Sequence, residues 1–244
     1  MLPDTILYLN HVGYIGGAEV ALLDLLRHLD RERYAPVVLS PAGALSDAVR
    51  ESDAEWVRIP LLPGLNRYTL PCFLVRFLQL VGPIRRLRPA LLHANTNFTS
   101  LYAGLIARSL GIPSIGHIHD IEPLGRMGRR LVRQNDVLIA ISDAVQAYLV
   151  AEQVPADRIV RIHNGVDLQK YRPRSVRSDS GHEGADLSVI VGIVGQIGRR
   201  KGHLYLLEAV RSLLPRYPQL RVWIVGQEPR QSIEGCTEQL QRFV

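Results

Sequence analysis

Short apolar runs alternate with segments of helical periodicity along most of this chain, and this alternation strongly constrains its fold. The expected strands are rich in Val, Ile, Leu and Ala, and they cover residues 5–10, 35–40, 55–60, 90–95, 113–119, 136–142 and 158–164. The expected helices fall between them, at 18–29, 44–52, 72–87, 98–110, 126–132 and 143–151. Alternating strands and helices form right-handed βαβ units, so the sequence predicts an α/β fold with a parallel, Rossmann-like sheet.

Polar side chains stand where several of these strands end. They include Asn10, His93, His119, Ser142 and Asn164. Parallel sheets of this class bind ligands beyond the carboxyl ends of their strands. We therefore expect a binding site along this edge.

A second α/β domain is expected to begin near Ser188. The linker predicted at 174–187 is charged and contains Gly and Ser. Two strands and two helices are expected after it, at 188–195, 220–226, 202–215 and 230–243. We expect an N-terminal domain over 1–173 and an incomplete second Rossmann-like domain over 188–244, because domains usually have roughly 100–150 residues.

The basic charge of the chain is concentrated in clusters. The net charge is +6, and three clusters hold arginines at 85–88, 126–133 and 199–200, the last extended by Lys201. Such clusters favour phosphates or lipid head groups, although a solvated helix face has the same composition. Aromatic residues are only 6% of the chain and do not interleave with the clusters. A nucleic-acid partner is therefore not expected.

Cysteine content and apolar segments indicate a cytoplasmic protein. Cys72 and Cys236 cannot form a disulfide framework. The first residues lack the pattern of a signal peptide. The apolar stretch 70–84 contains Arg76 and two prolines and is too short to span a bilayer.

Two glycine-containing loops are candidate phosphate sites. Gly16 and Gly17 precede the first helix, where backbone amides and the helix dipole favour an anion, although a tight turn has the same sequence. The second loop runs from Gly195 to Gly202 and carries basic residues that suit a diphosphate. It is not a dinucleotide fingerprint, because the first acid after it, Glu228, comes too late, and it lacks the G-K-[ST] of a Walker A loop.

His119 and Asp120 close a strand, and an imidazole there suits proton or phosphate chemistry at neutral pH. His117 is expected on the same face, two residues away. No further spacing supports a metal site, so none is predicted. The glycosylation pattern at Asn97 is interpreted as accidental.

The order of these motifs resembles that of the family 4 glycosyltransferases, which have the GT-B fold of two facing Rossmann-like domains. The matching segments are Gly16–Glu19, Pro89–His93, Gly111–Pro113, His119–Asp120, Ala140–Ser142, His163–Asp167 and Gly195–Gly202. The resemblance covers residues 5–226. It implies transfer of a sugar with retention from a nucleotide-sugar donor to a glycan or lipid-linked acceptor, without a cofactor or metal.

The resemblance also implies roles for individual residues. His119, Arg199 and Lys201 are the expected catalytic residues: His119 beside the transferred sugar, and the two cations at the diphosphate. The expected donor-binding residues are Gly16, Gly17, Ser142, Asn164, Gly195 and Gln196. Two departures stand against the family pattern. Gln196 replaces a common arginine, and the family's C-terminal pair of glutamates has no counterpart.

Three alternatives remain open from the sequence. The first is a non-catalytic acceptor-binding or scaffold protein of the same fold. The second is another nucleotide-sugar enzyme, such as an epimerase. The third concerns location. The segment 72–87 contains Phe73, Phe77 and Leu80 and is followed by arginines up to Arg88. Such a segment could contact the inner face of an anionic membrane peripherally, whereas the simpler interpretation is a core-facing helix.

Overall fold

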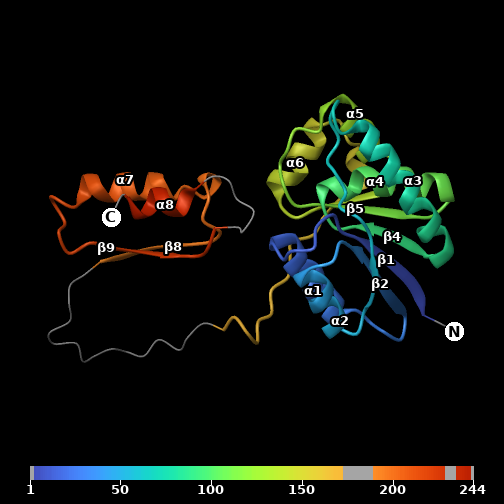
Figure 1. The fold of residues 1–244 in the computed structure, drawn as a ribbon, viewed down its shortest axis with the longest axis horizontal. Helices are drawn as coiled ribbons and strands as arrows, with labels where there is room; N and C mark the ends of the chain where they lie inside the picture. The colour runs from blue at the N-terminus through green and yellow to red at the C-terminus, as the bar shows by residue number, and fades with distance from the viewer. Residues whose placement is uncertain (1–2, 173–188, 229–234, 243–244) are drawn as a thin grey trace. The chain divides into compact units, whose positions relative to one another are not determined.

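The computed structural model describes residues 3–172, 189–228 and 235–242 (Figure 1). The chain divides into two compact units, which we call the N-terminal unit (Met1–Pro173) and the C-terminal unit (Arg174–Val244). The linker predicted at 174–187 lies outside the described residues. Each unit is described by itself below.

The N-terminal unit is built on a seven-stranded sheet of order β3-β2-β1-β4-β5-β6-β7. Its strands are β1 (Asp4–Leu9), β2 (Tyr34–Ser40), β3 (Glu55–Arg58), β4 (Leu91–Ala94), β5 (Ser114–Ile118), β6 (Val137–Ala140) and β7 (Ile159–Arg161). Every neighbouring pair is parallel. The predicted Rossmann-like α/β sheet is confirmed.

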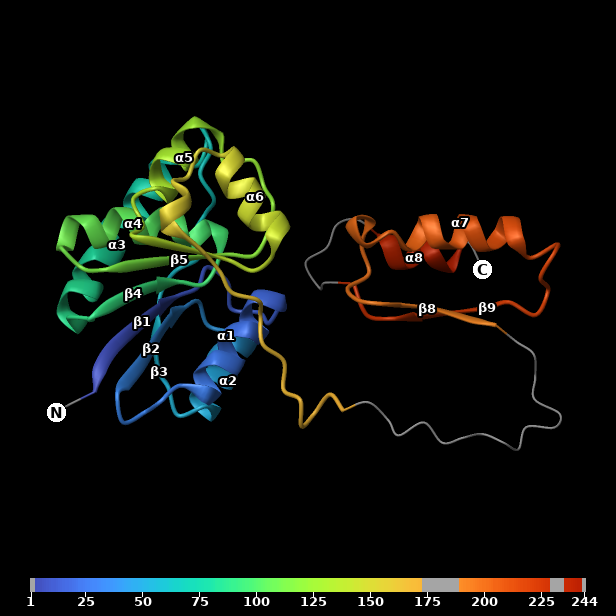
Figure 2. The same cartoon turned by 180° about the vertical axis from the view of Figure 1, so that it is seen from behind.

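Six α-helices cover the two faces of this sheet. They are α1 (Gly17–His28), α2 (Ala44–Glu51), α3 (Leu70–Leu87), α4 (Asn97–Leu110), α5 (Gly125–Val132) and α6 (Asp143–Ala151). Figures 1 and 2 show α1 and α2 on one face and α3 to α6 on the other. Side chains alternate accordingly along β1: Ile6 and Tyr8 pack in the core under α1 and α2, and Leu7 and Leu9 pack in the core under α3 to α6.

The predicted element bounds differ from the structure mainly at the ends. Helix α3 begins at Leu70 rather than Cys72, because Pro71 sits in the first turn, where its missing N–H has no partner to lose. It ends at Leu87, followed by Arg88 in the left-handed conformation at a φ of 47°. The predicted strand 158–164 is shorter in the structure, since the β7 ladder ends at Arg161.

The C-terminal unit contains β8 (Ile190–Val194) and β9 (Arg221–Val225), which pair in parallel, with α7 (His203–Leu213) and α8 (Cys236–Gln241). Part of the helix predicted at 230–243 lies outside the described residues. Both helices lie on one face of the strands (Figure 1). The core of this unit consists of Ile197, Leu207 from α7, and Cys236 and Leu240 from α8.

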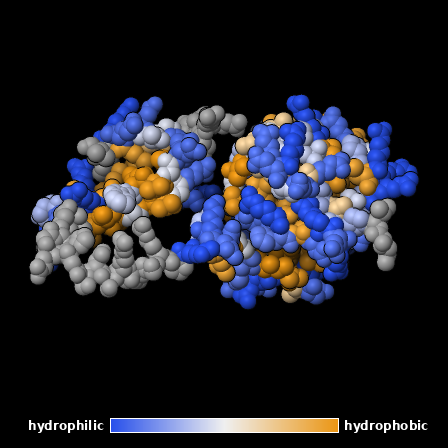
Figure 3. Space-filling view, turned by 90° about the horizontal axis from the view of Figure 1, so that it is seen from below, coloured by the Kyte–Doolittle hydropathy of each residue, from blue (hydrophilic) through white to orange (hydrophobic). Residues whose placement is uncertain are grey.

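The other face of β8 and β9 is hydrophobic and exposed. Val194 is 80% exposed and Trp223 is 60% exposed. Figure 3 shows this face as a broad hydrophobic area. Parallel strands usually have both faces covered, so this pair of strands carries more exposed apolar surface than its fold type normally does.

Among the described residues, no helix combines the length and the apolar character that crossing a membrane requires.

Candidate functional site

The carboxyl ends of β1, β4, β5 and β6 carry the polar residues that the sequence singles out. Because the strands are parallel neighbours, these ends lie along one edge of the sheet. The loop after β1 leads to Gly16 and Gly17, the segment after β5 holds His119, and Ser142 follows β6. The structure therefore gathers the predicted residues of the N-terminal unit along one edge.

The loop after β1 is fixed at both of its ends. The backbone N–H of Gly16 donates to Glu19 Oε2 at 2.9 Å, and Glu19 is buried. Gly13 O accepts from the Leu45 N–H at 2.9 Å, which ties this loop to the start of α2. Gly17 begins α1, where the first N–H groups have no acceptor within the helix. This helix start can receive an anion.

Two buried asparagines join the loop after β1 to the end of β4. Asn10 is 0% exposed and Asn95 is 1% exposed. Asn95 Nδ2 donates to Asn10 Oδ1 and to the Ala18 carbonyl, each at 3.1 Å, and Asn10 Nδ2 donates to the Val12 carbonyl at 2.9 Å. Buried amides of this kind need such partners, and here the pairing holds the beginning of α1 against β4.

Asn97 fixes the backbone at His119 and Asp120. Its Oδ1 accepts from the His119 N–H at 3.0 Å and from the Asp120 N–H at 3.4 Å, while its Nδ2 donates to the Asp120 carbonyl at 2.7 Å. The sequence interpretation missed this role. The neighbouring Thr96 and Thr99 cap the start of α4, with the Thr96 N–H donating to Thr99 Oγ1 at 2.9 Å.

Three histidines form a row across β4 and β5. The ring centroids of His93 and His117 are 5.6 Å apart, and those of His117 and His119 are 4.2 Å apart. The expectation that His117 and His119 share a face is therefore confirmed. The Nε2 atoms of all three are buried and have no hydrogen-bond partner among the described residues. Tyr8 extends the row, with its ring 5.1 Å from that of His93.

Burial keeps these histidines neutral. It lowers the pKa of His93 to about 4 and that of His117 to about 3, and the neighbouring imidazoles add to both shifts. Burial also lowers the pKa of His119, against a smaller opposing effect of the Asp120 carboxylate. A neutral imidazole can accept or donate a hydrogen bond at neutral pH. Among the described residues, no group of three or more His, Cys, Asp or Glu side chains is arranged to hold a metal ion.

Ser142 and Asn164 have different surroundings. Ser142 is the N-cap of α6, and its hydroxyl accepts from the Val145 N–H at 3.2 Å. Asn164 is exposed. The neighbouring His163 contacts the Ile141 carbonyl through Nδ1 at 2.9 Å. This contact brings the segment of Asn164 toward the end of β6.

The C-terminal unit holds the remaining predicted residues in the loop between β8 and α7. Gly195 has a φ of 152° and follows β8 directly. Arg199 and Lys201 lie in a single 3₁₀ turn and are exposed, as is Gln196. The basic side chains are thus presented at the start of a helix, the arrangement predicted for binding a diphosphate.

The model of glycosyltransferase family 4 matches residues 15–170. The chain belongs to this family. The match begins at the loop before α1 and includes His119, so it spans most of the edge described above. The predicted resemblance is confirmed.

Two curated proteins illustrate the range of family 4 relatives. A candidate glycosyltransferase of Bacillus subtilis, EpsF, is 22% identical over 233 residues, which are 88% of this chain and 59% of EpsF. The D-inositol 3-phosphate glycosyltransferase of Corynebacterium urealyticum is 34% identical over 122 residues, 46% of this chain and 28% of that protein. The chain thus spans less than two thirds of the length of these relatives.

Solved structures share the family 4 fold at low sequence identity. Alr3699/HepE of Anabaena, solved with UDP and glucose, has a TM-score of 0.75 and 19% identity, over 98% of this chain and 65% of HepE. The UDP-GlcNAc 2-epimerase of Neisseria meningitidis has a TM-score of 0.60 and 15% identity, over 98% and 69%. The GT-B class of fold is confirmed by these neighbours.

Proposed function

We propose that this family 4 protein transfers a sugar, with retention, from a nucleotide-sugar donor to a glycan or lipid-linked acceptor. The observation that carries the proposal is the family match over the edge that holds Gly16, Gly17 and His119. The fold shared with HepE, which was solved with UDP and glucose, supports a nucleotide sugar as the donor.

In the proposed reaction, the bond between the anomeric carbon and the diphosphate breaks. A bond from the acceptor hydroxyl oxygen to the anomeric carbon forms with the same configuration, and the hydroxyl proton passes to the leaving diphosphate. The leaving diphosphate gains negative charge, so preorganised donors and cations near it lower the barrier. We assign this role to the side chains of Arg199 and Lys201 and to the backbone N–H groups at the start of α1, where Gly16 and Gly17 lie. The Gly16 N–H itself donates to Glu19, which leaves the following N–H groups for the diphosphate.

His119 is the proposed catalytic residue of the N-terminal unit. Its backbone is fixed by Asn97, and its neutral ring can accept a hydrogen bond from a sugar hydroxyl. Ser142, Asn164, Gly195 and Gln196 are the further proposed donor-binding residues. We assign no cofactor or metal to the reaction, and we propose a cytoplasmic location because two cysteines cannot form a disulfide framework.

The test combines binding and turnover. The chain is titrated by calorimetry with UDP-, GDP- and ADP-sugars, and the products formed with polyprenyl-phosphate-linked acceptors are identified by mass spectrometry and anomeric NMR. We expect binding of one nucleotide class and a product of retained configuration. His119→Ala should abolish turnover, while His28→Ala, at the exposed end of α1, serves as the matched control.

Three results would contradict this proposal in different ways. If no nucleotide sugar bound to the chain, the proposed class of donor would be wrong. Conversion of the sugar to its epimer, without an acceptor, would indicate an epimerase. Equal turnover by the wild type and His119→Ala would be compatible with sugar transfer but would show that His119 is not a catalytic residue.

A further inference from the structure

Four aromatic rings follow one another across one face of the N-terminal sheet. Tyr8 on β1 is in register with His93 on β4, and their ring centroids are 5.1 Å apart. The ring of His117 on β5 lies 5.6 Å from that of His93. The ring of His119, which directly follows β5, lies 4.2 Å from that of His117. We call Tyr8, His93, His117 and His119 the ring row.

The ring row leads from the core of the N-terminal unit to its polar edge. Tyr8 is 2% exposed and packs in the core under α1 and α2. His93 is 6% exposed, whereas His117 and His119 are half-buried. Exposure thus rises along the row, and the last ring belongs to the proposed catalytic residue.

Hydrogen bonds fix the backbone of His119 but do not fix the orientation of its ring. The Asn97 side chain bonds to backbone atoms of His119 and Asp120. The Nε2 atom of the His119 ring is buried and has no hydrogen-bond partner among the described residues. A side chain on a fixed backbone still has three staggered χ1 rotamers. The orientation of this ring therefore depends on what packs against it.

The ring of His117 supplies this packing. It meets the ring of His119 at an interplanar angle of 36°, and the ring of His93 meets it at 55°. Aromatic rings in tilted contact attract one another. Burial lowers the pKa of His93 to about 4 and that of His117 to about 3. Both rings are therefore uncharged at neutral pH and pack without mutual repulsion.

We propose that His117 is a positioning residue: its ring, supported by that of His93, holds the ring of His119 in the rotamer that acts on the transferred sugar. The effect on turnover rests on the proposed function, whereas the effect on the ring of His119 does not. The contact is made by ring packing. A phenyl ring in place of the imidazole should therefore preserve it, and a methyl group should not.

The first experiment measures the χ1 rotamer of His119 in the ligand-free full chain. Three-bond NMR couplings from Cγ to the backbone N and C′ report this angle in protein with labelled histidines, and His119→Gln identifies the signals. We expect the couplings of a single rotamer in the wild type and in His117→Phe, and averaged couplings in His117→Ala. Single-rotamer couplings in His117→Ala would overturn the proposal, as would averaged couplings in the wild type.

The second experiment measures turnover and donor affinity separately. Without the packing, only the molecules with His119 in the productive rotamer turn over. Loss of one aromatic contact corresponds to a roughly fivefold smaller fraction of such molecules, so kcat should fall roughly fivefold in His117→Ala and recover in His117→Phe. The Kd of the nucleotide sugar should change by less than about twofold. Equal losses of kcat in the two variants would show that ring packing is not the cause.

A second aromatic pair provides the matched structural control. Phe73 of α3 stacks on Tyr102 of α4 at 4.0 Å, on the other face of the sheet. Phe73 and Leu80 are buried in the core and Phe77 packs against it, which agrees with the core-facing interpretation of this helix. Phe73→Leu removes a comparable ring contact and should destabilise the unit without changing kcat or the His119 couplings. Equal changes of these couplings in Phe73→Leu and His117→Ala would overturn the proposal.

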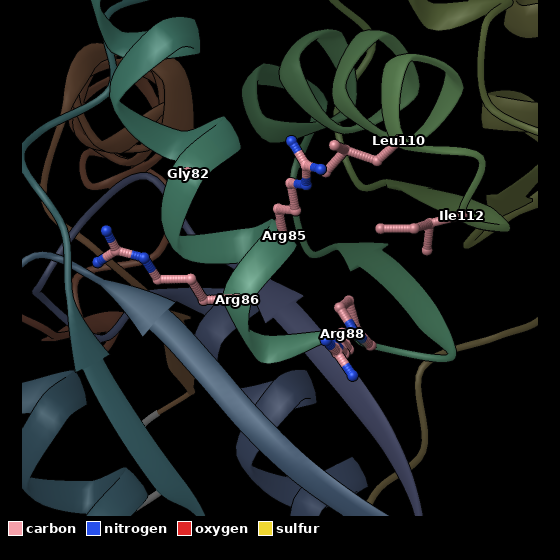
Figure 4. Close-up of a pocket in the computed structure, with 7 residues that line it drawn as sticks. Gly82, Arg85, Arg86, Arg88, Leu110 and Ile112 are labelled. Carbon is pink, nitrogen blue, oxygen red and sulfur yellow. The ribbon is translucent and has the colours of Figure 1, made fainter.

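Donor affinity needs its own control, because a basic hollow lies at the amino ends of β4 and β5. It has a volume of about 1100 Å³, and it is lined by Gly82, Arg85, Arg86, Arg88, Pro89, Leu110 and Ile112. Figure 4 shows Arg85 pointing toward Leu110. An anionic nucleotide sugar can bind nonspecifically at such a cluster of arginines. The titrations are therefore repeated with Arg85→Gln/Arg88→Gln added to the wild type and to His117→Ala, and the ratio of the two affinities should stay the same.

The two experiments separate this proposal from the proposed function. If the wild type showed no turnover, the proposed function would fail, and the His119 couplings would still decide whether His117 positions the ring. If turnover were present and the couplings did not change in His117→Ala, the proposed function would stand and the role of His117 would be wrong. Circular dichroism confirms that each variant is folded.

Discussion

Asn97 and His119 are joined by a hydrogen bond in which the His119 backbone N–H donates to Asn97 Oδ1 at 3.0 Å. Asn97 is the first residue of α4, and His119 follows the last residue of β5. The amide thus connects the helix after β4 with the chain leaving β5. The position of the proposed catalytic histidine depends on a residue 22 positions earlier in the chain.

Replacement of Asn97 by alanine should therefore destabilise the N-terminal unit and lower turnover. It removes one donor and leaves two partly buried N–H groups without their acceptor, which costs about 2 kcal/mol of unfolding free energy. Urea denaturation measures this change. Asn66→Ala is the matched control, because Asn66 also accepts from two backbone N–H groups, at Tyr68 and Thr69, but on an exposed turn. Equal losses in the two variants would contradict the expectation.

The buried histidines predict a loss of stability in mild acid. The pKa of His93 is lowered from 6.5 to about 4, and that of His117 from 6.5 to about 3. Between pH 6.5 and these values the unfolded chain binds a proton that the folded chain does not. Unfolding free energy should therefore fall with decreasing pH, by about 1.4 kcal/mol per pH unit for each such histidine.

Urea titrations at pH 5, 6, 7 and 8 test this dependence. His117→Gln removes a group whose ring contacts those of His93 and His119, and should flatten the slope by about 1.4 kcal/mol per pH unit. His28→Gln, which removes an exposed histidine, is the control. A slope unchanged by His117→Gln would show that His117 does not contribute.

Gly116 in β5 should not tolerate alanine. An added Cβ would lie 2.6 Å from Leu138 Cδ2 on β6 and 2.9 Å from Ser100 Oγ on α4, so both buried side chains would have to shift. We expect a loss of about 1–3 kcal/mol from overpacking. Gly82→Ala in α3 is the matched control, because apart from its chain neighbours no atom lies within 4 Å of the new Cβ. It should change stability by less than about 1 kcal/mol, since the gain in helix propensity is opposed by the contact of the new Cβ with Pro83, the next residue. Thermal unfolding of both variants measures the difference.

The Gly17→Ala variant separates an effect on nucleotide-sugar binding from an effect on folding stability. A Cβ at Gly17 meets no atom within 4 Å, so the variant should fold with unchanged stability. A methyl group there would occupy space that we propose for the donor diphosphate. We expect nucleotide-sugar affinity to fall about tenfold or more, which corresponds to about 1.4 kcal/mol. Calorimetric titration measures it, with Gly82→Ala as the control. Wild-type affinity in Gly17→Ala would place the diphosphate away from this helix start.

The strands and helices of the N-terminal unit could be predicted because their signals are local. Buried parallel strands are continuous apolar runs, as at β1 and β2, and their order along the chain predicts the class of sheet. Helix ends were predicted less well. The start of α3 depends on a proline in its first turn. Periodicity alone does not show which of the apolar residues of α3 are buried in the core.

The role of Asn97 could not be predicted from its neighbours. Its sequence pattern matches a glycosylation acceptor, and only the fold brings it to His119. The capping pair Thr96 and Thr99 was a usable signal, since it marks the start of a helix at a strand end. Which chain segment meets that helix start depends on sheet order. The proposed donor contacts of Arg199 and Lys201 stay predictions.

The backbone contact between Gly13 and Gly43 has a consequence for loop engineering. Gly13 O accepts from Leu45, and a Cβ on Gly43 would lie 2.4 Å from that same oxygen. A Cβ on Gly13 would in turn lie 2.3 Å from the Ala42 oxygen. A chimera that grafts the loop after β1 from a relative must therefore carry the loop after β2 with it, because the two segments are a single unit of exchange.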